Sequence, residues 1–300
     1  MQPILITLSA IVSWALLSVV SRILLVTLDL DPWMFSFLQL VAGGCALLFI
    51  GYRGAGSSSS FLRPSTWMLG ALRVLSAALY TAVLASISVM EAGIIGSINL
   101  PVIAILAWGL SRQPPIGLAW IGHVVVLAAV ALMTFRLEAD LRPIILGLMG
   151  LNAVCLAAMN LIAEHHPENT SATLSGRAWF SGVVLAITAA AFLGLRLLQG
   201  GEIASALSTS LIVSSVAVGV LLRAPSMFLA FWAVNIAGAQ SYTAAIALLP
   251  LFGMMFEQIG VYLGFLDTSR FQFENLYIAV FTLAGTLLVW ASKQNFKSRT

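Results

Sequence analysis

Charge is scarce in this chain: 8% of its 300 residues are Asp, Glu, Lys or Arg, whereas 60% are hydrophobic. Soluble domains carry about 25% charged residues, so this composition excludes a water-soluble fold of this length. A bilayer accommodates an apolar exterior, and each spanning helix needs about 20 apolar residues. We therefore expect an all-α integral membrane protein with short loops.

Motifs for several kinds of chemistry are also missing. The sequence has no Walker A, HExxH or GxSxG motif and no Lys/Arg run that would favour nucleic acid. We expect no enzyme, no metal, no cofactor and no nucleic-acid partner. A lipid-modifying enzyme is the alternative, but its candidate groups, Glu257 and His123, are isolated from each other in sequence. Cys45 and Cys155 lie in apolar segments, where packing is expected and a disulfide is the alternative.

The chain does contain ten apolar stretches, separated by clusters of Gly, Pro and Ser. They cover residues 3–25, 33–50, 66–88, 92–110, 117–135, 143–163, 176–195, 214–237, 242–264 and 276–292. The first stretch lacks a basic start and is too long for a signal-peptide core, so we expect a retained helix. Residues 203–237 predict either an interfacial helix followed by a span or one longer tilted helix.

Loop charges predict the orientation. With both termini in the cytoplasm, the inner side has more Lys and Arg than the outer side, which is the bias that membrane proteins show. The inner residues are Arg53, Arg63, Arg112, Arg177, Lys293, Lys297 and Arg299, and the outer ones are Arg136, Arg142, Arg196 and Arg270, with Arg22 at a helix end. We expect a multi-pass protein of a bacterial-type inner (plasma) membrane with both termini cytoplasmic.

The two halves of the sequence resemble each other. Residues 73–101 and 223–250 each begin with Arg, contain a tight polar hairpin (MEAG, GAQS), and end at a proline 28 or 27 residues later. Five spans per half is an odd number, so the second half would be inverted. We expect five-helix repeats over residues 1–137 and 138–300, around a central cavity.

Inverted repeats are typical of secondary transporters, whose interrupted helices point to the binding site. Pro101 and Pro250 interrupt matching helices and each leaves a carbonyl without its helical partner. We expect hinge or gating positions at both; packing kinks are the alternative.

Three segments carry a family resemblance: SINLPVIAIL, IALLPLFGMM and WIGHVVVLAAVALM. With the 5+5 arrangement, they resemble the drug/metabolite transporter superfamily in its ten-helix EamA-type branch, and within it aromatic amino-acid exporters of the YddG type. The resemblance implies secondary transport by alternating access. The chain departs from the family at Gln113, where many members have a glutamate.

Polar and aromatic residues within the spans are the substrate-site candidates. The alternatives are hydrogen bonding between helices, packing and interfacial anchoring. Few charges and many rings suit a neutral or aromatic solute better than a sugar phosphate. The candidates are Ser13, Trp14, Tyr80, Asn99, Asn152, Trp179, Trp232 and Asn235.

Three charged residues need separate interpretation. Glu257 is the acid placed firmly within a span, where the alternatives are proton coupling, a local hydrogen bond, or contact with water near the outer end. Arg73 and Arg223 are interpreted as lying near the entrances of their helices and reaching to the interface. Binding of a carboxylate is the alternative for both arginines.

These observations favour a secondary transporter that exports neutral or aromatic amino acids across the bilayer. Efflux of another small metabolite or a lipophilic drug by the same fold is the alternative, and a receptor or scaffold is a more distant one. Small residues such as Gly122 and Gly285 would pack the two halves or form a dimer, so a monomer and a homodimer both remain open.

Overall fold

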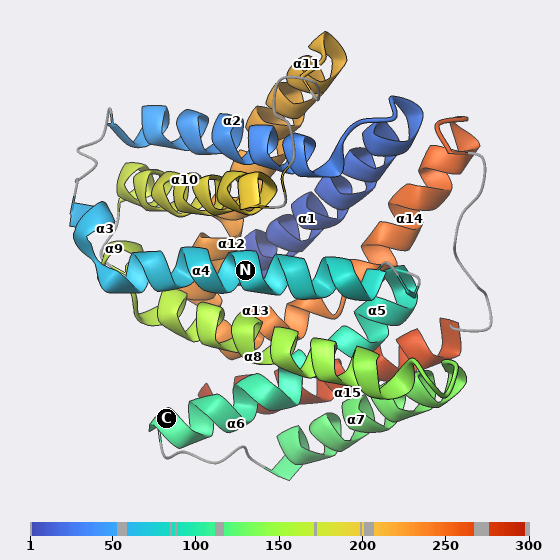
Figure 1. The fold of residues 1–300 in the computed structure, drawn as a ribbon. Coiled ribbons are helices and arrows are strands. Elements are labelled where there is room, and N and C mark those ends of the chain that lie inside the picture. Colours follow the sequence, from blue (N-terminus) through green and yellow to red (C-terminus); the bar gives the residue numbers. More distant parts are fainter. Residues whose placement is uncertain are drawn as a thin grey trace.

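The computed structural model describes residues 2–52, 59–84, 86–87, 89–111, 117–170, 173–198, 200, 207–266 and 276–297. The regular elements in these ranges are all helices, which confirms the all-α class (Figure 1). They are α1 (Gln2–Thr27), α2 (Pro32–Tyr52), α3 (Ser59–Leu62), α4 (Pro64–Leu84), α5 (Val89–Gly96), α6 (Asn99–Ser111), α7 (Gly117–Arg136), α8 (Arg142–His165), α9 (Pro167–Thr170), α10 (Leu174–Leu198), α11 (Thr209–Val218), η1 (Gly219–Arg223), α12 (Ala224–Ala237), α13 (Ala239–Ile246), α14 (Leu249–Tyr262) and α15 (Leu276–Lys297).

Most of these helices fit the thickness of a bilayer. In the described ranges, eight helical segments are long and apolar enough to cross a membrane. Two other expected spans coincide with α4 and α15, which are not among the eight; the apolar part of α15 is Leu276–Ser292. Backbone groups inside lipid need internal partners, which is why apolar segments adopt helices here.

The ambiguous region after residue 203 contains one long helical segment, Thr209–Ala237. A five-residue π-helix, η1, interrupts it, and the Ala224 N–H bonds to the Gly219 carbonyl. Pro225 follows at the start of α12 and has no N–H to donate, so the wider turn accommodates it. Of the two alternatives left open for this region, the structure has one longer helix over residues 209–237.

Both proline-containing helices are broken where the sequence predicted. Ser97 and Ile98 form the turn between α5 and α6, and Ala247 and Leu248 form the turn between α13 and α14. Each break is closed by tight backbone bonds, such as Ile98 N–H to Ile95 at 3.1 Å and Leu248 N–H to Ala245 at 2.9 Å. The first piece has eight residues in both cases.

Glycines allow two pairs of helices to pack at very short range. Helix α2 lies along α10, and α7 lies along α15 (Figure 1). A Cβ on Gly182 would lie 3.0 Å from the Gly44 carbonyl, and one on Gly122 would lie 2.5 Å from the Gly285 carbonyl. Gly122 and Gly285 therefore pack two helices of the same chain together.

Candidate substrate-binding site

Two arginines converge on one tryptophan in the interior of the helix bundle. The Arg73 Cζ lies 5.0 Å and the Arg223 Cζ lies 5.2 Å from the centroid of the Trp14 ring. Trp14 comes from α1, Arg73 from the middle of α4, and Arg223 from the end of η1 at the middle of Thr209–Ala237. The interpretation of both arginines as residues that reach the interface from a helix entrance is therefore wrong.

The polar atoms of this cluster lack ordinary partners. Among the described residues, neither guanidinium of Arg73 or Arg223 forms an ion pair or a hydrogen bond. The buried Nε of Arg223 and Nε1 of Trp14 have no acceptor. All three side chains retain part of their accessible surface. The phenol of Tyr242, from α13, is near enough to Arg73 to interact with it electrostatically.

Two predicted site residues, Asn235 and Trp232, lie in a polar network around Arg177. The Arg177 Nη2 donates to Asn235 Oδ1 at 3.2 Å and to the Asn169 carbonyl at 3.1 Å. Its Cζ also lies 5.7 Å from the Trp232 ring centroid. This arrangement ties α10 to α9 and α12, which is the structural alternative considered for Asn235 and Trp232.

The other predicted amides are buried. Asn152 accepts a hydrogen bond from Ser76 at 2.6 Å, which joins α8 to α4. Asn99 stands at the start of α6, and its Oδ1 has no hydrogen-bond partner among the described residues. The structure thus leaves Asn99 as the predicted amide with an unused acceptor.

The remaining predicted positions are spread over the bundle. Tyr80 borders a core cluster to which α5, α7, α8 and α15 contribute most of the buried residues, whereas Trp14 and Trp232 border another cluster. Trp179 lies against Gly51 of α2, and Ser13 is half-buried on α1. The structure does not bring all the predicted aromatic residues together.

The two broken helices contact each other near the second break. A Cβ added to Gly93 would lie 2.4 Å from Cγ of Pro250, so α5 packs directly on the start of α14. Pro101 instead borders a small apolar crevice of about 80 Å³ with Trp120 and His123 of α7.

Glu257 forms an ion pair with Arg22 that joins α14 to α1. The side chains are 12% and 23% exposed, so the pair is shielded from solvent without being fully enclosed. The sequence did not suggest Arg22 as a partner because 235 residues separate the two.

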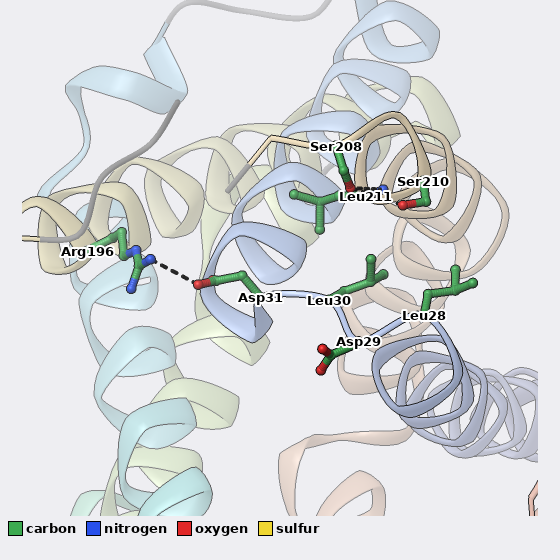
Figure 2. A pocket seen from close by; sticks show the side chains of 8 residues that line it. All are labelled: Leu28, Asp29, Leu30, Asp31, Arg196, Ser208, Ser210 and Leu211. Carbon is green, nitrogen blue, oxygen red and sulfur yellow. Dashed lines mark hydrogen bonds and ion pairs between the residues drawn. The ribbon is translucent and has the colours of Figure 1, made fainter. Parts of the chain in front are cut away.

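A larger pocket of about 600 Å³ opens at the ends of α1, α2, α10 and α11, and Figure 2 shows its lining. Arg196 Nη2 and Asp31 Oδ2 form an ion pair of 2.9 Å there, and Ser208 caps α11 through the Leu211 N–H. None of the predicted site residues lines this pocket.

His166 organises the loop between α8 and α9. Its Nε2 lies 3.2 Å from Thr66 Oγ1, its Nδ1 accepts the Glu168 N–H at 3.3 Å, and its ring stacks on Phe180 at 4.4 Å. Burial lowers the pKa of His166; Glu168 opposes this and Arg63 adds to it. Neutral His166 with its proton on Nε2 fits these contacts.

Apolar helices of spanning length identify the chain as a multi-pass helical membrane protein. Residues 1–135 match the EamA-like transporter family, a family of small-molecule transporters and not of enzymes. A solved crystal structure has the same fold, with a TM-score of 0.68 and 16% sequence identity over 96% of each chain. No curated protein matches the sequence.

The arrangement that sequence reasoning missed is the Arg73–Trp14–Arg223 cluster. A signal was present, since each arginine starts one of the matching stretches and interrupts a long apolar segment. An ionisable residue inside a spanning segment indicates a functional site by default.

Five residues named in the sequence analysis lie outside the described residues: Gln113, Arg53, Arg112, Arg270 and Arg299.

Proposed function

We propose that this protein is a ten-helix secondary transporter of the EamA type that moves small organic molecules by alternating access. Its repeats would cover residues 1–137 and 138–300, with the second half inverted. The family match over residues 1–135 supports the first repeat. The single observation that carries the proposal is the matched pair of broken helices, α5–α6 and α13–α14.

The helix packing supports two exchangeable halves. Helix α5 packs on α14, and α13 packs on α6, so each broken helix contacts the other reciprocally. In the same way α1 packs on α12 and α14, while α8 packs on α4 and α6. Two halves with equivalent contacts can exchange conformations, which opens a central site to one side and then to the other.

Gating would take place at the breaks. The turns before Pro101 and Pro250 lack regular helical bonding, so they can absorb a change in backbone angles at low cost. The contact between Gly93 and Pro250 links the first break to the second. The Arg22–Glu257 pair joins α1 to α14 and would have to separate if those helices move apart.

Amino acids, neutral and aromatic, are the proposed cargo, and export is the proposed direction. Trp14, Asn99 and Tyr242 offer a ring, an amide oxygen and a phenol toward the bundle interior. Another small metabolite or a lipophilic drug is the second candidate, because partly exposed aromatic side chains alone would suffice to bind it.

Proteoliposomes loaded with radiolabelled amino acids test the proposal. We expect efflux above that of protein-free vesicles, and a change in rate when a pH gradient is imposed. Absence of movement for every amino acid, with movement of another solute class, would replace the cargo; absence of any movement would refute the transport function.

Labelling of single cysteines from either side tests the inverted arrangement and the cytoplasmic termini. In a chain lacking Cys45 and Cys155, Cys at Arg63 is expected to react from inside and Cys at Glu138 from outside. If both positions reacted from the same side, the inverted-repeat topology would be wrong.

A further inference from the structure

We propose that Arg73, Arg223 and Trp14 form a binding site for the oxyanion of an organic anion, with a carboxylate as the expected group. The inference rests on the proposed function and names the chemical class of its cargo. It modifies the expectation of a neutral solute, because two cationic side chains lie against one tryptophan ring in the bundle interior.

The first argument is the cost of the two charges. A charged side chain at mid-membrane depth is expensive and is normally paired with an acid or backbone carbonyls. Arg22, Arg63 and Arg196 each have a carboxylate partner. Arg73 and Arg223 have none among the described residues, and they also repel each other. A bound anion would supply the missing partner.

The second argument is geometric. A guanidinium stacked on an aromatic ring keeps its in-plane N–H donors available, and those donors match the two oxygens of a carboxylate. The guanidinium groups of Arg73 and Arg223 both lie over the Trp14 ring, at 5.0 and 5.2 Å from its centroid. The Arg223 Nε–H and Trp14 Nε1–H have no acceptor in the described structure. These two groups are hydrogen-bond donors, which favours an anion over a cation as their partner.

The third argument concerns the origin of the two arginines. Arg73 belongs to α4 and Arg223 to the end of η1, which occupy equivalent places in the two proposed repeats. An anion held by one donor from each half contacts both halves at once. Its binding would therefore depend on how the halves are arranged, as a transported substrate must.

A matched set of probes tests the charge requirement. Binding of 3-phenylpropanoate, L-phenylalanine, L-phenylalaninamide, phenethylamine and phenyl phosphate to the purified protein is measured by calorimetry and thermal shift, with inorganic phosphate and acetate as minimal anions. We expect the carboxylates to bind and the amide and amine to fail. Tighter binding of phenyl phosphate would assign the oxyanion to a phosphate ester instead.

Variants locate the binding. Arg73→Gln and Arg223→Gln are each expected to weaken carboxylate binding by at least about tenfold, because a charge-assisted hydrogen bond is lost. Arg73→Lys should lose less, since it keeps the charge. Arg136→Gln is the matched control: Arg136 also stacks on a ring, that of Tyr277 at 5.1 Å, but stands at the end of α7.

Stability without ligand provides a readout that a structural role would not give. Removal of an unpaired charge is expected to raise the unfolding temperature of Arg73→Gln and Arg223→Gln, whereas removal of a structural arginine would lower it. Lower stability in both variants together with unchanged anion binding would overturn the proposal. So would equal binding of the amide and the carboxylate, or no binding of any anion.

The two proposals fail separately. If proteoliposomes move a neutral or cationic solute and anions neither bind nor compete, the anion site is wrong and transport stands. If anions bind with the expected dependence on Arg73 and Arg223 but no solute moves, the binding site stands and transport is wrong.

Discussion

Gly122→Ala tests the close packing between α7 and α15 quantitatively. A Cβ at residue 122 would lie 2.5 Å from the Gly285 carbonyl oxygen and 2.9 Å from the Val289 backbone nitrogen. Backbone atoms cannot move aside as a flexible side chain can, so the helices must separate. Overpacking of this kind costs about 1–3 kcal/mol.

Gly147→Ala is the matched control for the change in residue type. Gly147 also lies within a helix, α8, and nothing comes within 4 Å of its added Cβ. Alanine favours a helix over glycine by about 1 kcal/mol, so this variant should be slightly more stable than the parent. Gly122→Ala gains the same helix propensity, so the two variants should differ by the overpacking cost alone, about 1–3 kcal/mol.

Thermal unfolding in detergent measures this difference. For a protein of this size 1 kcal/mol corresponds to roughly 2–4 °C, so we expect the unfolding midpoint of Gly122→Ala to lie about 2–12 °C below that of Gly147→Ala. Gly285→Ala should behave like Gly122→Ala, because its Cβ would lie 2.9 Å from the Gly122 carbonyl. A Gly122→Ala variant as stable as Gly147→Ala would refute the proposed contact between these helices.

Three further predictions concern polar groups. Glu257→Gln should lower the free energy of unfolding by about 1–3 kcal/mol, because Arg22 loses its partner, and adding Arg22→Gln should recover part of that loss in thermal unfolding. If a pH gradient stimulated transport by Glu257→Gln as much as by the parent, proton coupling at this residue would be excluded. The lowered pKa of His166 means that the folded protein favours the neutral imidazole, so its contribution to stability is present above the unfolded pKa of about 6.5 and is lost as pH falls toward the folded pKa. The unfolding midpoint should therefore fall less steeply from pH 7.5 to 5.5 in His166→Gln than in the parent. Equal slopes in the two proteins would contradict this origin. Asn235→Ala should lower the unfolding temperature because the contact with Arg177 is lost, while ligand affinity should change by no more than about twofold. A large loss of affinity at unchanged stability would show that Asn235 contacts the ligand.

The sequence predicted the segments well because local physics determines them. Apolar runs in lipid adopt helices, and a proline without an N–H breaks a helix near its own position, so the breaks before Pro101 and Pro250 were predictable. The union of residues 209–237 into one helix was left open, because apolar character alone does not distinguish an interfacial segment from part of a span.

The candidate site was less predictable because it depends on contacts between distant segments. The hydrogen bond between Arg177 and Asn235 joins residues 58 positions apart, and no local sequence pattern reveals it. Arg73 was assigned to a helix entrance because the span was expected to begin at residue 66; α4 begins at Pro64, and its middle lies at Arg73. Trp14 was identified, but the two arginines over its ring were not.

The π-helix η1 contains about one residue more per turn than its flanking helices, and this sets the direction in which the side chains of α12 point. Each residue of an α-helix advances the direction of side chains by about 100°. Deletion of one residue within Gly219–Arg223 would let the segment relax to regular α geometry and turn α12 by about that angle relative to α11. Trp232 would then point away from Arg177. The extra residue in this turn thus determines in which direction the side chains of α12 point relative to those of α11.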